Sequence, residues 1–492
     1  MTTLLSTITT IGFLQALSIV ANAARAKVIA VLLGPEGVGV VGIVDQVVLV
    51  VVNISSLSLP FSALPFLSRS YGQGRAAFEQ TYVRFFTVVV VCTTAGTAVA
   101  VAIVGMRSGL LDETLLRYHS LLIIGLLSVP ALAVISLGAN TIAAARRPWQ
   151  SGVVVAGTAT AIFLAAVVGI STHALVGVYW ANLLASVVVA GAVIGYLRRH
   201  LGLPLWKRGA RIVNELTRAD LAFFCVSYSF VSFAYPVAWL IARYAVLHQF
   251  GEAEAGRLHA VLALMLGFGA VLRPVNSQLL LPIVSSPGAT DRKFCSTVEV
   301  QRRLTVALAL LAMPLVLFPQ WLLTALYSTA FRAASHYVHL FIVAEMILIL
   351  GGTYQALVLG LNDIRAWAFS YVLGYAWLGG MSWALGTAYG LPGVAVAAMS
   401  AGVLVFVLGL WRLQSHHGFR LPADLLRMTA LVGASILAVG EACARYDDGS
   451  VTVLFVKIVA LLGSVPGLVG CLDREDREWV YRLLTRSQWR ST

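Results

Sequence analysis

Long apolar segments, separated by short polar turns, follow one another along the whole chain. Each has about 20 residues or more, which at 1.5 Å per residue lets a helix cross about 30 Å of hydrocarbon. A transmembrane barrel would instead show segments of about ten residues with alternating polarity, and the sequence lacks them. The pattern therefore predicts an all-α, polytopic membrane protein.

The apolar segments predict about 14 transmembrane helices. Their expected ranges are 4–33, 38–67, 81–106, 119–145, 151–171, 174–197, 220–248, 258–284, 304–326, 338–361, 367–389, 391–411, 426–443 and 451–471. The first range has no basic n-region and no small-residue cleavage site, so we expect it to stay as a membrane anchor rather than to be cleaved.

The distribution of basic residues predicts the orientation of these helices. If the N-terminus is cytoplasmic, 24 of the 34 Lys and Arg residues fall in cytoplasmic loops and the C-terminal tail, against five in the outer loops. This bias follows the positive-inside rule and places both termini in the cytoplasm. The tail, 472–492, carries Trp479, Val480, Leu483 and Leu484 on one helical face and is expected to lie on the inner leaflet.

The composition agrees with a membrane protein: 59% of the residues are hydrophobic and 11% are charged, where soluble domains have about 25% charged residues. The net charge of +13 is explained mostly by the cytoplasmic loops, which need no acidic partner beyond lipid head groups and no nucleic acid. The five cysteines are scattered, and no His/Cys cluster has the spacing of a zinc site. We therefore expect no metal centre and no disulfide framework.

Landmarks in the first half of the chain recur at a nearly constant spacing in the second half. The pairs are 34–39 (GPEGVG) with 251–256 (GEAEAG), 147–149 with 365–367, and 177–178 with 393–394, at offsets of 217, 218 and 216. Each copy holds six spans, an even number, so both copies keep the same orientation. The sequence thus predicts two six-helix lobes related by an axis along the membrane normal, with a site between them.

The duplication defines five expected parts. They are an N-lobe at 1–200, a basic cytoplasmic linker at 201–218, a C-lobe at 219–413, two additional spans within 414–471 and the amphipathic tail at 472–492.

Motifs of soluble enzymes are weak or missing. Residues 37–42 spell G-x-G-x-x-G, but a long apolar helix precedes the glycines where the dinucleotide fingerprint requires a strand. Glycines that tighten a turn and allow close helix packing explain this run better. The sequence has no G-x-x-x-x-G-K-[ST] motif and no loop long enough for a catalytic domain. We therefore expect a transporter without catalytic residues or cofactors rather than an enzyme.

Five basic residues fall inside predicted spans: Arg25, Lys27, Arg243, Arg273 and Lys457. A cation at the bilayer centre costs about 2.5–3.5 kcal/mol on insertion scales, so each must face a partner, a wet cavity or the interface. Lys457 lies near a span end and is expected to snorkel to the interface. The other four are candidates to line a polar cavity.

Two carboxylates are candidate partners for these cations. Asp45 lies at a similar depth to Arg25 and Lys27, and it is expected to pair with one of the two, because residues two apart on a helix project about 200° from each other. Glu345 lies at a depth where it is expected to pair with Arg243. Cations still exceed acids, and such a cavity should bind an anion, best of all a phosphate.

The segment AKVIAVLLGPEGVGVVGIVDQ, residues 26–46, resembles the first hairpin of Wzx-type O-antigen and polysaccharide flippases. These belong to the multidrug/oligosaccharidyl-lipid/polysaccharide exporter superfamily, and the six-plus-six duplication and the start of the second copy agree with the resemblance. It covers residues 1–415 in architecture, while its sequence signature is concentrated in the first hairpin.

The resemblance implies a protein of the bacterial cytoplasmic membrane with two bundles that open alternately to either side. It also implies movement of undecaprenyl-diphosphate-linked glycans from the inner to the outer leaflet, with polysaccharide polymerase or chain-length machinery as a possible partner. Carried onto this chain, the residues that bind the diphosphate are Arg25, Lys27, Arg243 and Arg273.

Other interpretations stay open at this stage. Asp45 and Glu345 either couple transport to a proton or sodium gradient or serve as permanent counter-ions. Fourteen spans and arginines in the first spans are also features of lipid II flippases of peptidoglycan synthesis. A multidrug cation antiporter of the same fold should instead have a dominant carboxylate.

Overall fold

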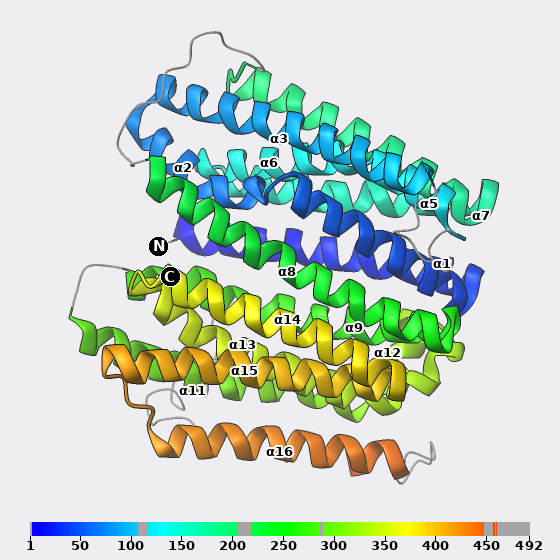
Figure 1. Cartoon of the computed structure of the whole chain (residues 1–492), viewed down its shortest axis with the longest axis vertical. Helices are drawn as coiled ribbons and strands as arrows, with labels where there is room; N and C mark the ends of the chain where they lie inside the picture. The colour runs from blue at the N-terminus through cyan, green and yellow to red at the C-terminus, as the bar shows by residue number, and fades with distance from the viewer. Residues whose placement is uncertain are drawn as a thin grey trace. The chain divides into compact units, whose positions relative to one another are not determined.

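The structure, a computed structural model, describes residues 2–106, 117–204, 218–285, 289–446, 456–457 and 459. All regular elements in these ranges are helices (Figure 1). They are α1 (Thr2–Ser55), α2 (Leu59–Gln73), α3 (Arg75–Gly105), α5 (His119–Leu127), α6 (Val129–Ala144), α7 (Pro148–His200), α8 (Arg218–Phe250), α9 (Glu252–Pro274), the π-helix η1 (Val275–Leu280), α10 (Leu281–Ser285), α11 (Thr290–Leu317), α12 (Pro319–Leu326), the 3₁₀-helix η2 (Thr329–Tyr337), α13 (Val338–Gly360), α14 (Ile364–Tyr389), α15 (Leu391–His417) and α16 (Ala423–Tyr446).

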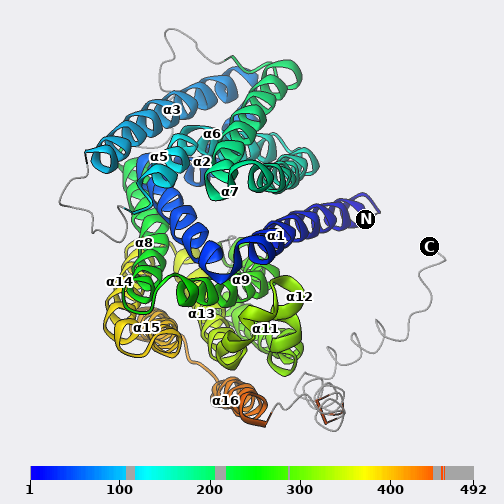
Figure 2. The ribbon, with the colours of Figure 1, turned by 90° about the vertical axis from the view of Figure 1, so that its right-hand side faces the viewer.

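The chain is a multi-pass membrane protein. Ten helices in the described part are long and apolar enough to cross a membrane. Two of them contain a break: α1 at Gly34, and α7 at His173 and Ala174. Figure 2 shows α1 as two arms that meet at a bend, so one hydrogen-bonded element carries two of the predicted spans. The predicted span 451–471 (apart from 456–457 and 459), the tail 472–492 and linker residues 205–217 lie outside the described residues.

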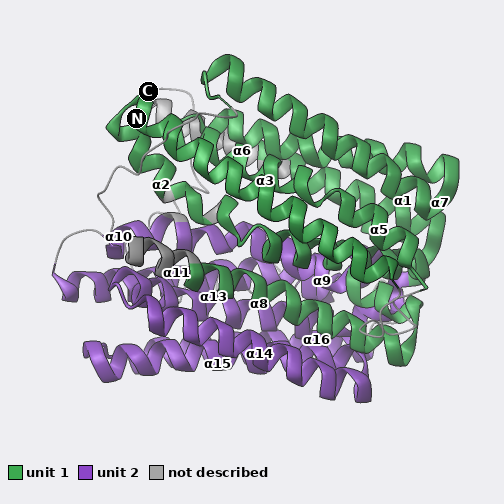
Figure 3. Ribbon diagram, turned by 45° about the horizontal axis from the view of Figure 1, so that its top comes forward, with its two compact units in different colours: residues 1–259, 326–330 green, residues 260–325, 331–492 purple. Residues whose placement is uncertain are grey.

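The helices divide into two compact units (Figure 3). Unit 1 contains residues 1–259 and 326–330, and unit 2 contains residues 260–325 and 331–492. Unit 1 therefore includes α8 and the start of α9, which belong to the second sequence copy. The lobe limits expected from the sequence stay a prediction beside this division.

Each unit has its own apolar core. In unit 1 the core lies among α2, α3, α6 and α7 and includes Leu67, Tyr82, Leu137 and Leu197, all at most 1% exposed. In unit 2 it lies among η1, α10, α13 and α15 and includes Leu280, Tyr354, Leu357 and Leu413. Valines on the outer side of α3, such as Val91 and Val99, are 60% exposed, as expected for a face that contacts lipid.

The backbone repeats the predicted duplication. A residue with positive φ recurs at an offset of 216 or 217 in four places, and the two members of each pair have similar φ angles. The pairs are Gly34 with Gly251, Arg146 with Asn362, Ala174 with Gly390 and Gly202 with Gly418. Ala174 and Gly390 also share their ψ angle, at −132° and −135°. Turns of one geometry thus separate the helices of both copies.

One landmark of the sequence comparison was misaligned by two residues. Arg147 and Arg365 were matched at an offset of 218, but the residue of the second copy that shares the backbone angles of Arg147 is Asp363. Both residues precede a helix, α7 or α14, with ψ near 60°. Both segments have the sequence Arg-x-Trp, and they were matched by this identity. The turn geometry before the helix, however, shows which residues of the two copies are equivalent.

The landmark at Gly177 and Gly393 is confirmed by packing. A Cβ atom on Gly177 would lie 2.1 Å from the carbonyl oxygen of Gly169, and a Cβ on Gly393 would lie 2.0 Å from that of Leu385. Gly169 and Leu385 are themselves equivalent positions of the repeat, at the same offset as the two glycines. The same close approach between a helix pair therefore occurs in each unit.

The two copies touch each other reciprocally inside unit 1. A Cβ atom on Gly39 would lie 2.2 Å from the carbonyl oxygen of Glu252, and a Cβ on Gly256 would lie 1.9 Å from that of Pro35. Gly39 and Gly256 are equivalent in the repeat, as are Pro35 and Glu252. The contact is thus the same from both sides, as at a local two-fold axis. We call these four residues the glycine crossing.

We predict that Gly39→Ala destabilises the protein by about 1–3 kcal/mol, because the new methyl group meets backbone atoms that cannot rotate away. The measurement is thermal unfolding of the purified protein in detergent. Gly157→Ala is the matched control, since a Cβ there has nothing within 4 Å. Equal melting temperatures for the two variants would contradict the close approach at the glycine crossing.

Candidate functional site

Arg25 and Asp45 form an ion pair between the two arms of α1. The Arg25 Nη1 lies 3.0 Å from the Asp45 Oδ2, and the two side chains are 17% and 34% exposed. Tyr179 of α7 donates its hydroxyl hydrogen to the other oxygen of Asp45 at 3.0 Å. The structure decides the choice left open by the sequence: the partner of Asp45 is Arg25. Lys27 lies about 200° further around the helix.

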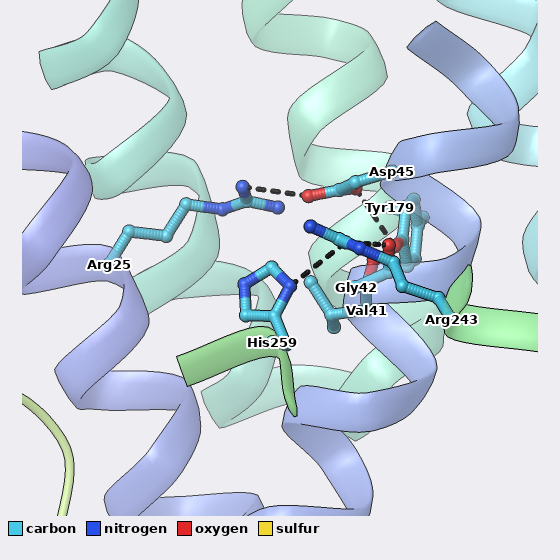
Figure 4. Close-up of polar contacts among 7 residues, drawn as sticks. All are labelled: Arg25, Val41, Gly42, Asp45, Tyr179, Arg243 and His259. Carbon is cyan, nitrogen blue, oxygen red and sulfur yellow. Dashed lines mark hydrogen bonds and ion pairs between the residues drawn. The ribbon is translucent and has the colours of Figure 1, made fainter. Parts of the chain in front are cut away.

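Arg243 of α8 points into the same group of side chains, as Figure 4 shows. It is 6% exposed, and its Nη1 donates to the carbonyl oxygen of Gly42 and to the Nδ1 of His259, the latter at 3.0 Å. Among the described residues, no carboxylate forms an ion pair with it. Arg243 is thus a buried cation whose hydrogen-bond acceptors are neutral.

The cluster leaves hydrogen-bond donors unused. In the described part of the chain, the Nε atoms of Arg25 and Arg243 are both buried without a hydrogen-bond partner. Buried polar groups are nearly always satisfied, and an unsatisfied one attached to a charge is especially unfavourable. Two guanidiniums, those of Arg25 and Arg243, also share the one nearby carboxylate of Asp45. Such an arrangement is complementary to a bound anion.

His259 is a member of this cluster that the sequence analysis missed. It lies at the position of the second copy equivalent to Gly42 in the first, and the two residues touch: a Cβ on Gly42 would lie 2.5 Å from the His259 Nδ1. Leu262, an apolar residue, occupies the position of the second copy that is equivalent to Asp45. Testing every repeat position for a polar residue would have identified His259.

In unit 2, Glu345 of α13 binds Arg273 of α9. The Arg273 Nε lies 2.6 Å from one carboxylate oxygen and its Nη2 lies 2.7 Å from the other, so the pair is bidentate. The carboxylate of Glu345 is fully buried. The expected pairing of Glu345 with Arg243 is therefore wrong. Depth along a helix, on which it was based, does not determine which neighbouring helix a side chain faces.

The segment after Arg273 is held to α13 by an asparagine. The Asn276 amide donates to the carbonyl oxygen of Ile349 at 2.8 Å, and its side-chain oxygen accepts from the Thr353 hydroxyl at 3.1 Å. Asn276 lies in the π-helix η1, directly after Pro274, and π-helical turns often occur at functional sites. Unit 2 thus holds a paired, neutral charge cluster, whereas the cluster of unit 1 has a cation surplus.

Two further expectations concern charged and metal-binding groups. The Lys457 side chain is 6% exposed, and its Nζ lies 5.9 Å from the centre of the Phe318 ring, within the range of a cation–π contact. The expected snorkelling stays a prediction. Within the described ranges, no group of three or more His, Cys, Asp or Glu residues is arranged to hold a metal ion.

Comparison with known proteins identifies the fold. No protein-family model matches the chain, and no curated protein sequence matches it. Among solved structures, the lipid II flippase MurJ in an inward closed conformation has 10% identity and a TM-score of 0.69, covering 98% of this chain and 100% of that chain. An inward-facing MATE family multidrug resistance transporter of the MOP superfamily has 13% identity and a TM-score of 0.60, covering 83% and 96%.

A third similar structure is a MOP superfamily transporter from Pyrococcus furiosus, described as having a binding pocket of reverse polarity. It has 13% identity and a TM-score of 0.53, covering 82% of this chain and 94% of that chain. At these identities the likeness shows the fold. The chain has the fold of MOP superfamily transporters.

We predict that Arg273→Met destabilises the protein by about 3–5 kcal/mol, because it leaves the buried carboxylate of Glu345 without its partner. The double variant Arg273→Met/Glu345→Gln should recover most of this loss, since it removes the uncompensated charge. Thermal unfolding of both variants in detergent measures the difference. A double variant as unstable as Arg273→Met alone would show that the pair contributes through something other than its charges.

Proposed function

We propose that the protein is a flippase for polyprenyl-diphosphate-linked oligosaccharides. In this proposal it moves undecaprenyl-diphosphate-linked O-antigen, capsule or exopolysaccharide units from the inner to the outer leaflet of the bacterial cytoplasmic membrane. Both termini are cytoplasmic, and a polymerase or chain-length protein receives the product. The resemblance of the first hairpin to polysaccharide flippases supports this substrate class.

The observation that carries the proposal is the buried Arg243, which forms no ion pair with a described carboxylate, beside the Arg25–Asp45 pair. A diphosphate offers oxygens to the unused donors of two guanidiniums and supplies the negative charge that the cluster lacks. A cationic drug would meet surplus positive charge instead, which argues against the multidrug antiporter. Each guanidinium binds the charge-bearing part of the substrate, and neither contact depends on the sugar.

The residues act in sequence during transport. The diphosphate exchanges its hydration shell for Arg243, Arg25 and Lys27, and the Gly42 carbonyl and the His259 ring give up their bonds to Arg243. Arg273 of unit 2, the fourth cation expected to bind the diphosphate, is engaged by Glu345, and its part in binding stays a prediction. The polyprenyl tail remains in lipid while alternating access exposes the anion to the other side. Asp45 and Glu345 are candidates to couple these steps to a proton or sodium gradient.

A second candidate substrate is lipid II, which carries the same polyprenyl diphosphate. The likeness to the lipid II flippase MurJ spans nearly all of both chains, which favours this alternative over a substrate of different chemistry. The two candidates differ in the glycan alone. Complementation distinguishes them: rescue of a strain that lacks its O-unit flippase supports the first, and rescue of a strain depleted of its lipid II flippase supports the second.

We predict that Arg243→Gln lowers export of lipid-linked glycan at least tenfold, because losing a charged hydrogen bond to phosphate costs about 1.5–3 kcal/mol and about 1.4 kcal/mol is a factor of ten. Export is measured as surface glycan in cells and as flipping by purified protein in vesicles. Membrane abundance of the variant checks that insertion is intact.

The matched control is Arg303→Gln, which removes an arginine that is 52% exposed and bridges Glu299 one helical turn away. It should leave export unchanged. Normal export by Arg243→Gln at wild-type abundance would refute the anion-binding role of the cluster.

A further inference from the structure

We propose that His259 is a proton-binding site whose protonation is linked to anion binding at Arg243. The proposal rests on the proposed diphosphate site and adds to it a titratable residue and a pH dependence. In the structure, the His259 Nδ1 lies 3.0 Å from the Arg243 Nη1, and the contact is inside unit 1 (Figure 4).

The protonation state of His259 in this arrangement follows from hydrogen-bond chemistry. A guanidinium has donors alone, so the ring nitrogen that receives its N–H must offer a lone pair. Nδ1 of His259 is therefore unprotonated, the proton is on Nε2, and the ring is neutral. Arg243 thus uses His259 as an acceptor in place of an acid.

The surroundings of His259 are rich in charge. From α1, Arg25 faces the cluster together with Asp45, and from α7 Tyr179 binds Asp45. Tyr235 of α8 and Tyr327, just after α12, interact electrostatically with Arg243. Arg25 and Arg243 both place positive charge close to the His259 ring. Cations therefore dominate around the ring, and Asp45 is already engaged by two donors.

Protonation changes the partner of Arg243. A proton added at Nδ1 removes the lone pair that accepts the Arg243 N–H, and it places an imidazolium beside two guanidiniums. That state requires further negative charge close by, and a diphosphate supplies it. Once the anion is bound, both Arg243 and the Nδ1–H donate to its oxygens. The step adds one proton to Nδ1 and exchanges hydrogen bonds, without any covalent change.

Linkage then works in both directions. If the bound anion favours the protonated ring, lower pH must favour anion binding by the same factor. The diphosphate should therefore bind tightly when His259 is protonated. Loss of the proton from His259 should weaken the binding of the diphosphate. His259 would let the transporter release a doubly charged ligand without breaking the Arg25–Asp45 pair.

The experiment is isothermal titration of the purified full-length protein in detergent with a short-chain prenyl diphosphate sugar. This probe is a diphosphate diester, so its own charge stays constant while histidine titrates. We expect at least about threefold tighter binding at about pH 6 than at about pH 8. Heats compared in PIPES and imidazole buffers at one pH should reveal net proton uptake. In His259→Gln, which keeps an acceptor for Arg243, both effects should disappear.

The matched control is His339→Gln, which removes a histidine of unit 2 that is 4% exposed and lies beside Glu441; it should retain both effects. His259→Asn is a second variant for the case in which the glutamine variant fails to fold, and the proton count on the wild-type protein needs no variant. Binding without proton uptake, or equal uptake in His259→Gln, would overturn the linkage while leaving the anion site intact. Absence of binding to the wild-type protein at every pH would overturn the anion site itself and the linkage with it.

Discussion

In the described part of unit 1, the main constraint on the charged cluster is a buried guanidinium, that of Arg243, which has no ion-pair partner. Arg243 is compensated in the structure by a backbone carbonyl and a neutral histidine, while Asp45 is engaged by Arg25 and Tyr179. Neutral acceptors stabilise a buried cation less than a carboxylate does. The cluster can therefore still bind an anion, whereas an apolar helix interface or one with fully paired charges could not.

The internal repeat allows such an imbalance, because equivalent positions of the two copies carry different side chains. The two copies share turn geometry and a reciprocal contact, yet the charged positions differ: Asp45 corresponds to Leu262, Arg243 to Ala26, and His259 to Gly42. Each copy therefore contributes different groups to one cluster in unit 1. Unit 2 holds instead a bidentate Arg273–Glu345 pair in which the two charges neutralise each other. The two copies thus share the backbone geometry that places equivalent residues, while the different side chains at these positions determine the charge of each cluster.

The helical membrane fold and the internal repeat could be predicted from the sequence, because both are visible in the order of residues along the chain and need no knowledge of which residues are in contact. Apolar length identified the helices, and the turn glycines identified the repeat. Pairing was harder. Arg25–Asp45 was one of two alternatives, since Arg25 and Asp45 lie on the two arms of one hairpin. Glu345 was assigned to the wrong arginine, because its partner depends on helix rotation, which apolar sequence leaves undetermined. His259 was missed because a lone histidine carries no periodic signal.

The glycine crossing has a mechanical consequence. Helices usually interlock through side-chain ridges that fit into grooves, and this resists rotation of one helix on another. At Gly39 and Gly256 the backbones meet without side chains, so this point holds the hairpins of the two copies close while offering nothing to lock their angle. It is suited to act as a pivot, because swivelling at this point would move His259 of α9, which follows Gly256, relative to Asp45 of α1, which follows Gly39.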